Sequence, residues 1–330
     1  MKALRTLVLA VAALLAACSP ATPDKAPAAG APTVIRFATD WRAEAEHGGF
    51  YQALASGEYA RRGLDVKIIQ GGPGVNVPQL MAAGAVDMGI GSNAYIVMSL
   101  AQEKAPVKAV AAFMQKNPQV LIAHPDAGIE KVADLKGHPI LLSDASVSTV
   151  WMWMKARYGF ADDQVRKYNF SSAPFLADKR AAQQGYVTSE PYTLEKEAKL
   201  KPKVFLLADE GMGGYATLAL ATDSLIARNP AAVKAFVEAS AKGWHDYLNG
   251  DASAADALIR KDNPEMTQDV LDQARAKLKS YRIVEGDKGL ALGTMTEAEW
   301  KAFFDTGVAQ GLYPKTLDPK TAYTLAFSPK

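Results

Sequence analysis

The sequence predicts a two-lobed α/β protein built on parallel or mostly parallel sheets. Short β-rich segments, such as residues 33–38, alternate with segments of helical apolar spacing, such as residues 50–62, and this alternation is typical of parallel sheets. Several expected strands end at glycines, as at residues 71–74, which places their turns at one edge of the sheet. The body from residue 33 to residue 330 is long enough for two lobes with separate cores.

Residues 1–18 are predicted to be an export signal that is not part of the fold. Lys2 and Arg5 precede an apolar stretch that is too short to span a bilayer as a mature helix. Residues 15–18, Leu-Ala-Ala-Cys, resemble the lipobox of bacterial lipoproteins, whose cysteine is lipidated and becomes the mature N-terminus. Cys18 is the only cysteine in the chain, so we expect it to be the lipid anchor; the alternative is a thiol without a role. A lipidated Cys18 would leave a body without a disulfide, a cysteine metal site or a thiol nucleophile.

Composition indicates a tether followed by a neutral body. Residues 19–32 are rich in alanine and proline without aromatic residues, which is typical of a disordered tether. The chain has 37 Lys and Arg against 35 Asp and Glu, and removing Lys2 and Arg5 leaves 35 of each. Dispersed charges without a net sign argue against a nucleic-acid partner. Outside the leader, no apolar run approaches the roughly 20 residues of a spanning helix, so we expect membrane attachment through the lipid alone.

The first lobe, expected over residues 33–121 and 222–330, begins with repeated strand–helix units. Strands are expected at residues 33–38, 64–69, 86–90 and 107–114, and helices at residues 50–62, 77–83 and up to about 103. The later part is predicted to be helical, at residues 230–249, 252–261, 267–281 and 296–311. These helices are expected to wrap the first lobe, with Trp244 and Trp300 in its core.

The second lobe is expected over residues 122–221. Strands are predicted at residues 139–142, just before Glu190, and at 203–207, and residues 120–123 and 213–218 are expected to cross between the lobes. The helix after residue 149 carries Trp151 and Trp153. Residues two apart cannot share a helix face, so we expect one indole in the core and the other facing the cleft or solvent.

A binding mouth is predicted at residues 40–51, between the first strand and the first helix. This turn follows the carboxyl end of a strand, where open α/β sheets place their ligands. It offers the indole of Trp41, the imidazole of His47 and a glycine pair, Gly48 and Gly49, that would let backbone come close to a guest. The alternatives are a core position for Trp41 and a structural, backbone-satisfied histidine at 47.

Six further candidates for ligand binding lie at the ends of other expected elements: Asn93, Ser146, Thr149, Tyr186, Glu190 and Tyr215. Asn93, Ser146 and Thr149 can donate and accept hydrogen bonds; the alternative for them is helix capping alone. Glu190 suits an exocyclic amine beside the ring of Tyr186, or simply the dipole of the helix that it starts. Tyr186 and Tyr215 have packing at the hinge as their alternative.

The chemistry of these side chains favours a flat, neutral or cationic heteroaromatic ligand that carries amino groups. Stacking on Trp41 or on a tyrosine contributes on the order of 1 kcal/mol beyond burial. Sulfonate or nitrate capture prefers fixed cations, and Arg42 is the only guanidinium close to the expected mouth. No catalytic residue, metal or cofactor is indicated.

Several segments together resemble a family of periplasmic proteins that bind thiamine-pyrimidine precursors. They are Asp40-Trp41 and residues 47–51, 57–59, 63–66, 83–87, 134–137 and 185–191. The wider group includes nitrate-, taurine- and alkanesulfonate-binding proteins of ABC importers, and the likeness covers nearly the whole mature body. The Gly-Leu-Asp-Val and Ala-Gly-Xaa-Val-Asp pieces are common to that group. The Asp-Trp and His-Gly-Gly element is narrower and resembles the pyrimidine branch, which also contains a riboflavin-binding group.

The resemblance implies a type II periplasmic-binding fold, in which two α/β lobes joined by two crossover strands enclose a small molecule by hinge closure. It also implies an ABC permease and its ATPase as partners, with the protein tethered in the periplasm or cell envelope. The alternatives within this fold are a riboflavin receptor and a sulfonate or nitrate receptor.

An enzyme is the alternative from another class. The same family includes a fungal pyrimidine synthase, in which a histidine is consumed as substrate and a cysteine-rich motif participates with iron. His47 lies in the corresponding His-Gly-Gly context, but the cysteine motif is absent because Cys18 is the sole cysteine. We therefore expect a receptor without catalytic activity.

Overall fold

The computed structural model describes residues 30–72 and 74–329, and its folded part is the unit Pro32–Lys330. The leader and Cys18 lie outside the described residues, as does nearly all of the tether. The strands are β1 (Thr33–Ala38), β2 (Leu64–Ile69), β3 (Met88–Asn93), β4 (Val107–Met114), β5 (Gln119–Ala123), β6 (Ile140–Leu142), β7 (Val165–Lys167), β8 (Ala182–Tyr186), β9 (Lys203–Leu206) and β10 (Ala216–Thr222).

The helices of the first lobe are α1 (Gly48–Ala55), α2 (Glu58–Arg61), α3 (Val77–Ala82), α4 (Ala94–Gln102), α9 (Asp223–Arg228), α10 (Pro230–Asn249), α11 (Ser253–Asp262), α12 (Gln268–Ser280) and α13 (Glu297–Ala309). Those of the second lobe are α5 (Asp144–Val147), α6 (Val150–Tyr158), α7 (Ala173–Ala177) and α8 (Glu190–Ala198). Short 3-10 turns are η1 (Ala45–His47), η2 (Val132–Leu135), η3 (Asp162–Gln164) and η4 (Pro319–Thr321). Among the described residues, no helix combines the length and the apolar character needed to cross a membrane.

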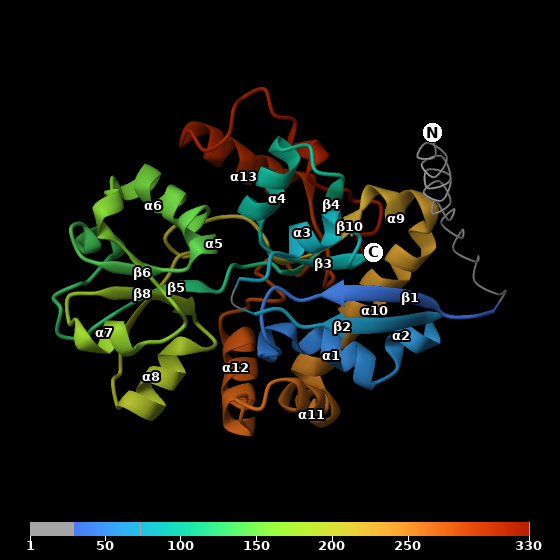
Figure 1. The fold of residues 1–330 in the computed structure, drawn as a ribbon, viewed down its shortest axis with the longest axis horizontal. Coiled ribbons are helices and arrows are strands. Elements are labelled where there is room, and N and C mark those ends of the chain that lie inside the picture. The colour runs from blue at the N-terminus through green and yellow to red at the C-terminus, as the bar shows by residue number, and fades with distance from the viewer. Residues whose placement is uncertain (1–29, 73, 330) are drawn as a thin grey trace, which may run out of the picture. The chain divides into compact units, whose positions relative to one another are not determined.

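Two five-stranded sheets form the two lobes (Figure 1). The first sheet has the order β2-β1-β3-β10-β4 and the second the order β7-β6-β8-β5-β9. β10 is antiparallel to both of its neighbours, and so is β5. Four of the five strands in each sheet therefore run in the same direction, which confirms the expectation of mostly parallel sheets. The fifth strand, β10 or β5, runs against the rest because it arrives from the other lobe.

The chain passes between the sheets twice, from β4 to β5 and from β9 to β10. Lys116 in the first crossing pairs with Asp209 in the second at 2.6 Å, which ties the two connections together. The expected lobe boundaries, after residues 121 and 221, remain a proposal. The pairing of β10 with β3 and β4 favours a return to the first lobe before Ala216.

Most expected elements are present, with differences where a turn interrupts a helix. The helix expected over residues 50–62 is divided into α1 and α2 at Gly57, whose φ of +76° ends the first helix. The expectation that only one of Trp151 and Trp153 is in the core is wrong, because they are 1% and 0% exposed. The chain after α6 folds back over the helix, so that Trp151 Nε1 donates to Asp162 at 2.7 Å. The ring of Trp153 packs edge-on against Tyr158 at the end of the same helix.

The glycine pair at the start of α1 serves helix packing, contrary to our expectation that it admits a guest. A Cβ atom on Gly48 would lie 2.1 Å from the ring of Tyr247, and one on Gly49 would lie 2.1 Å from the indole of Trp244. Both aromatic residues belong to α10 and are fully buried. The glycines therefore let α1 and α10 approach closely. Trp244 is a core anchor as predicted, and Trp300 is likewise buried.

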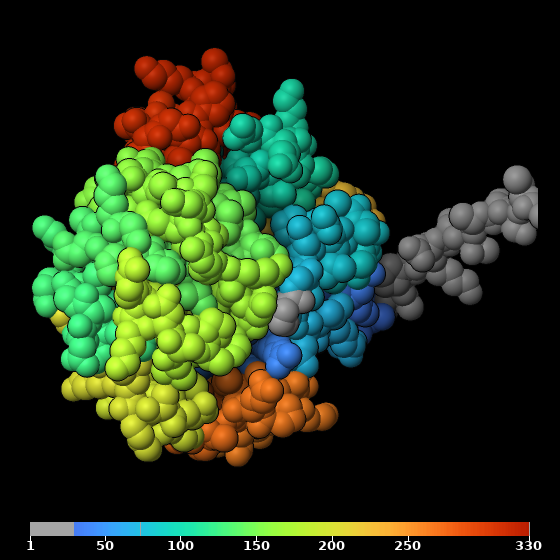
Figure 2. Space-filling view, turned by 60° about the vertical axis from the view of Figure 1, so that its left-hand side comes forward, coloured from blue at the N-terminus to red at the C-terminus, as the bar shows by residue number. Residues whose placement is uncertain are grey.

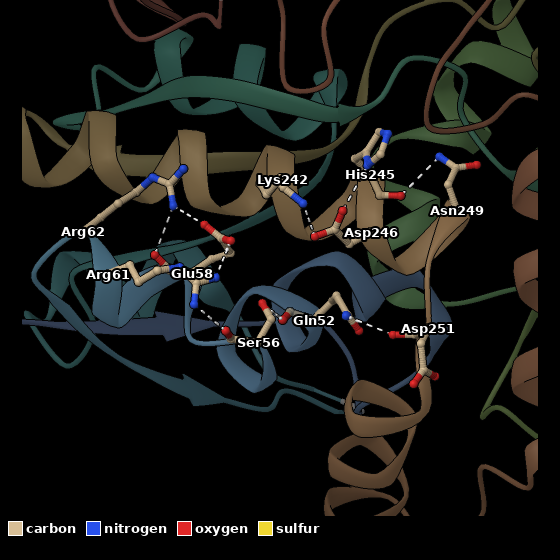
Figure 3. Close-up of polar contacts among 10 residues, drawn as sticks. All are labelled: Gln52, Ser56, Glu58, Arg61, Arg62, Lys242, His245, Asp246, Asn249 and Asp251. Carbon is tan, nitrogen blue, oxygen red and sulfur yellow. Dashed lines mark hydrogen bonds and ion pairs between the residues drawn. The ribbon is translucent and has the colours of Figure 1, made fainter.

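Polar contacts lie along α2 and along α10 beside this helix pair (Figure 3). Glu58 accepts hydrogen bonds from Arg61 and Arg62, and on α10 Lys242 pairs with Asp246. Burial alone would raise the pKa of the Glu58 carboxyl, but the hydrogen bonds from the two guanidinium groups lower it below its usual value. The charges of these side chains are thus paired with one another.

Candidate functional site

The turn between β1 and α1 is clamped to the end of β2. The hydroxyl of Thr39 donates to the carbonyl oxygen of Trp41 at 2.7 Å, and the N–H of Gly71 donates to the same oxygen at 3.0 Å. A Cβ atom on Gly71 would lie 2.4 Å from the carbonyl oxygen of Thr39, so only glycine fits there. Trp41 is thus held in a fixed position at the carboxyl end of the strand.

Carboxylates converge on this turn from both lobes. Asp40, Glu44 and Glu46 come from the turn itself, and Glu190 comes from the start of α8 in the second lobe. Burial raises the pKa of Glu44 well above its usual value, and the charges of Glu46, Asp40 and Glu190 raise it further. Asp40, Glu44, Glu46 and Glu190 together form what we call the acidic wall. A guest that brings positive charge or N–H donors would favour the ionised forms of these carboxyl groups.

Glu190 is held by the segment that precedes it. Its carboxylate accepts from the backbone N–H of Tyr186 at 2.8 Å and from the hydroxyl of Tyr168 at 3.4 Å. A Cβ atom on Gly185 would lie 2.8 Å from Oε2 of Glu190, so a glycine is needed beside it. Burial raises the pKa of Glu190 to about 7, although the two hydrogen bonds oppose the rise. This carboxyl therefore changes its charge near neutral pH.

Tyr186 lies at the end of β8 and is half-buried. Burial raises the pKa of its phenol well above the usual value, and the charges of Asp40, Glu44, Glu46 and Glu190 raise it further. The sensitivity to these four charges places the phenol close to the acidic wall. It remains protonated and can act as a hydrogen-bond donor.

His47 is 2% exposed, and its Nε2 lies 3.2 Å from Oδ1 of Asp40. Its Nδ1 is buried and has no hydrogen-bond partner among the described residues. A buried polar atom without a partner is costly. His47 therefore positions Asp40 and keeps one ring nitrogen available.

Several contacts hold the lobes together around these groups. The hydroxyl of Thr188, in the second lobe, donates to the carboxylate of Glu46, and Nε2 of Gln273 on α12 donates to the carbonyl oxygen of Thr188. Farther out, Tyr192 and Lys196 on α8 both donate to Asp269 on α12, at 2.6 and 2.7 Å. Figure 2 shows the orange surface of α12 beside the yellow surface of α8. The two lobes are therefore in direct contact at this edge.

Of the eight predicted ligand residues, four belong to this site and four make contacts elsewhere. Trp41, His47, Tyr186 and Glu190 lie around the acidic wall. The other four are engaged in local structure: Asn93 caps α4 by accepting from the N–H of Ile96 at 3.2 Å, Ser146 accepts from Gln119 at 3.2 Å, Thr149 donates to Ala145 at 2.8 Å, and Tyr215 accepts from the N–H of Thr296 at 2.9 Å. A role in ligand binding remains a prediction for all eight residues.

Tyr215 also lines a hollow beside the hinge, of about 290 Å³, together with Lys116, Asp209 and Lys288. A second hollow of about 360 Å³ lies beside Arg42, Gln70 and Asn263. Neither contains the acidic wall or Trp41. Among the described residues, no three His, Cys, Asp or Glu side chains are placed to hold a metal ion.

Sequence reasoning missed six residues of this region: Asp40, Glu44, Glu46, Tyr168, Phe170 and Thr188. Glu44 and Glu46 carried a usable signal, because two acids alternate with alanines in a turn at the end of a strand. Phe170, whose ring lies against Trp41 with 4.0 Å between centroids, carried none. Its partner is in the other lobe, 129 positions away.

Residues 44–254 match the family described as NMT1/THI5 like, which is more than half of the 330-residue chain. The chain belongs to this family. It is also similar to the riboflavin-binding protein RibY of Chloroflexus aurantiacus, with 27% identity over 98% of this chain and 97% of the relative. The resemblance of the sequence to this group is confirmed.

Solved structures show the same fold. The alkanesulfonate-binding protein SsuA from Xanthomonas axonopodis pv. citri, bound to MOPS, aligns with 89% of this chain and 99% of its own, with 15% identity and a TM-score of 0.65. The aliphatic sulphonate binding protein SsuA from Escherichia coli aligns with 89% of this chain and 92% of its own, with 16% identity and a TM-score of 0.65. The periplasmic-binding fold, with two α/β lobes and two crossings, is confirmed; identities this low concern the fold alone.

Proposed function

We propose that this family member is the substrate-binding protein of an ABC importer and captures a small, flat heteroaromatic that carries amino groups, such as a thiamine-pyrimidine precursor. The lobes would close on the ligand by rotation about the two crossings. The observation that carries the proposal is the acidic wall, in which Asp40, Glu44 and Glu46 of one lobe meet Glu190 of the other. An amino group or a protonated ring nitrogen is the partner that such carboxylates require.

Aromatic groups on both sides support the same ligand class. Trp41 and Tyr186 provide ring faces for stacking on the order of 1 kcal/mol each. A sulfonate or nitrate would be repelled by the ionised wall, and the guanidinium of Arg42 in the same turn is paired with Glu265 at 3.1 Å.

Riboflavin is the second candidate, because RibY is described as a riboflavin-binding protein. Its ring system could stack on Trp41, and its ribityl hydroxyl groups could donate to the carboxylates. It lacks a cationic group, so its affinity should depend much less on the charge of Glu190.

The export and anchoring of the protein are part of the same proposal. Cys18 would carry the lipid, so that the receptor stays close to the permease and ATPase in the cell envelope. Metabolic labelling with a fatty-acid analogue should mark the full-length chain, and Cys18→Ala should abolish the label. A Cys18→Ala chain that still carries the label would refute this assignment.

We also propose that the protein is a receptor without catalytic activity. Incubation with iron and pyridoxal phosphate, followed by mass analysis of the peptide that contains His47, tests this directly. Conversion of the His47 side chain would refute the receptor assignment and indicate a pyrimidine synthase. An unchanged histidine supports the receptor.

A thermal-shift panel tests the ligand class. The probes are 4-amino-5-aminomethyl-2-methylpyrimidine, riboflavin, taurine and nitrate. A ligand at one hundred times its dissociation constant stabilises the native state by about 2.7 kcal/mol, which shifts the melting temperature measurably. We expect the aminopyrimidine to give the largest shift. A shift with taurine or nitrate alone would refute the amine-bearing ring and leave the receptor assignment intact.

A further inference from the structure

Phe170 has an unusual backbone conformation. It lies between β7 and α7 with a φ of +61°, and its side chain is 41% exposed. A bulky L-residue rarely adopts a positive φ, and such a conformation persists only where the surroundings hold it. We therefore expect contacts of the Phe170 ring to hold this backbone conformation in place.

The contacts of the ring cross between the lobes. The centroid of Phe170 lies 4.0 Å from that of Trp41 in the first lobe, with 41° between the planes, and 5.1 Å from that of Tyr168. Trp41 is fixed by the two hydrogen bonds to its carbonyl oxygen. Tyr168, two residues before Phe170, donates to Glu190. Residues 168–170 of the second lobe thus contact both the indole of Trp41 in the first lobe and the carboxyl group of Glu190 in the second.

The distance between the two rings leaves no room for a guest. Aromatic pairs in contact have centroids about 4.5–7 Å apart, and Trp41 and Phe170 are already at 4.0 Å. A ligand ring that stacks on this face of Trp41 must first displace Phe170. The strained backbone at 170 lowers the cost of that displacement, because leaving the contact allows φ to relax.

We propose that Phe170 is a plug: its ring occupies the place on Trp41 that the ring of the ligand takes, and the two compete for the same face of the indole. The inference rests on the proposed function, in which Trp41 stacks the ligand. It assigns the face of Trp41 covered by Phe170 as the subsite for an aromatic ring. A competing group has one signature that a ligand-contacting group lacks: its removal strengthens binding.

The variants are Phe170→Ala, Phe170→Gly and Phe170→Tyr. Glycine accepts the positive φ without strain, so agreement between alanine and glycine assigns the effect to the ring. Tyrosine keeps the ring and should behave as the wild-type protein does. Met152→Ala is the matched control, because Met152 is an apolar side chain of the same lobe with 42% exposure.

The first measurement needs no ligand. In protein labelled with 5-fluorotryptophan, the fluorine resonance of Trp41 is identified by its loss in Trp41→Phe. We expect Phe170→Ala and Phe170→Gly to shift this resonance, and Phe170→Tyr and Met152→Ala to leave it nearly unchanged. An unshifted resonance in the alanine and glycine variants means that Phe170 does not cover Trp41 in solution, which overturns the proposal.

The second measurement follows the binding of 4-amino-5-aminomethyl-2-methylpyrimidine and of riboflavin by stopped-flow fluorescence. Removal of the competing ring should tighten binding about three- to tenfold, mainly through faster association. Unchanged or weaker binding in both the alanine and glycine variants overturns the plug. If neither probe binds the wild-type protein, the proposed ligand class fails, and the fluorine measurement still decides whether Phe170 covers Trp41.

Discussion

Replacement of Glu190 by glutamine tests the electrostatics of the site most directly. The pKa of about 7 means that the carboxyl is largely protonated at pH 6 and largely ionised at pH 8 in the ligand-free protein. A cationic amine binds the ionised form. Binding below pH 7 must therefore first remove a proton from Glu190, and the apparent affinity should fall as the pH falls.

The magnitude follows from the titration. With a pKa near 7, the ionised fraction is roughly one tenth at pH 6 and nine tenths at pH 8, so Glu190 alone should weaken binding about tenfold between pH 8 and pH 6. The pKa values of Glu44 and Glu46 are also raised by burial, and these groups can add to the slope. Glu190→Gln should therefore reduce the number of protons released on binding by about one, and the contributions of Glu44 and Glu46 to the pH dependence of the affinity should remain.

At pH 8 the variant also loses a charge-assisted hydrogen bond, whose contribution is about 1.5–3 kcal/mol, or roughly 10- to 150-fold in affinity. Glutamine keeps an oxygen that can accept from the N–H of Tyr186, so the start of α8 should remain intact. Glu195→Gln is the matched control, since Glu195 is an exposed acid on the same helix.

Calorimetry of 4-amino-5-aminomethyl-2-methylpyrimidine binding between pH 5.5 and pH 8.5, in two buffers of different ionisation enthalpy, measures both the affinity and the protons released. The titration of the ligand itself is common to all variants and cancels in the comparison. A wild-type slope equal to that of Glu190→Gln would refute the assignment of Glu190 as the acid that faces the amine.

Three further predictions concern stability. In the ligand-free protein, the raised pKa of Glu190 should lower the free energy of unfolding by about 3 kcal/mol at most as the pH rises from about 4.5 to about 7, with no further fall above that pH. Urea unfolding should show a smaller fall in Glu190→Gln, and an equal fall in the variant would contradict this prediction. Thr188→Val leaves the buried carboxylate of Glu46 without its hydroxyl donor and should cost about 1–3 kcal/mol at pH 8 and less at pH 5, with recovery in Thr188→Ser; a loss that does not depend on pH would point to packing instead. Gly49→Ala should lower the free energy of unfolding by about 1–3 kcal/mol, because the new methyl group meets the indole of Trp244, whereas Gly213→Ala, which meets no atom within 4 Å, should cost little.

The sequence by itself determined the elements and the class of fold. Strands at residues 33–38, 64–69 and 107–114 and the long helix at residues 230–249 have the expected bounds, because alternation of side chains and the 3.6-residue period are local properties. Trp41 and Glu190 could be selected for the same reason, since each lies in a turn next to a recognisable strand or helix.

Only the tertiary structure decided which side chains from distant parts of the chain contact one another. The direction of β10 depends on its return from the other lobe, and the purpose of Gly49 depends on an indole almost 200 residues later. Phe170 meets Trp41, and Glu190 joins Glu44, only when the lobes come together. These contacts involve side chains from distant parts of the chain, and local spacing does not encode them. The acidity of the site is likewise a tertiary property, because burial and neighbouring charges raise a pKa that the residue type alone leaves near 4.5.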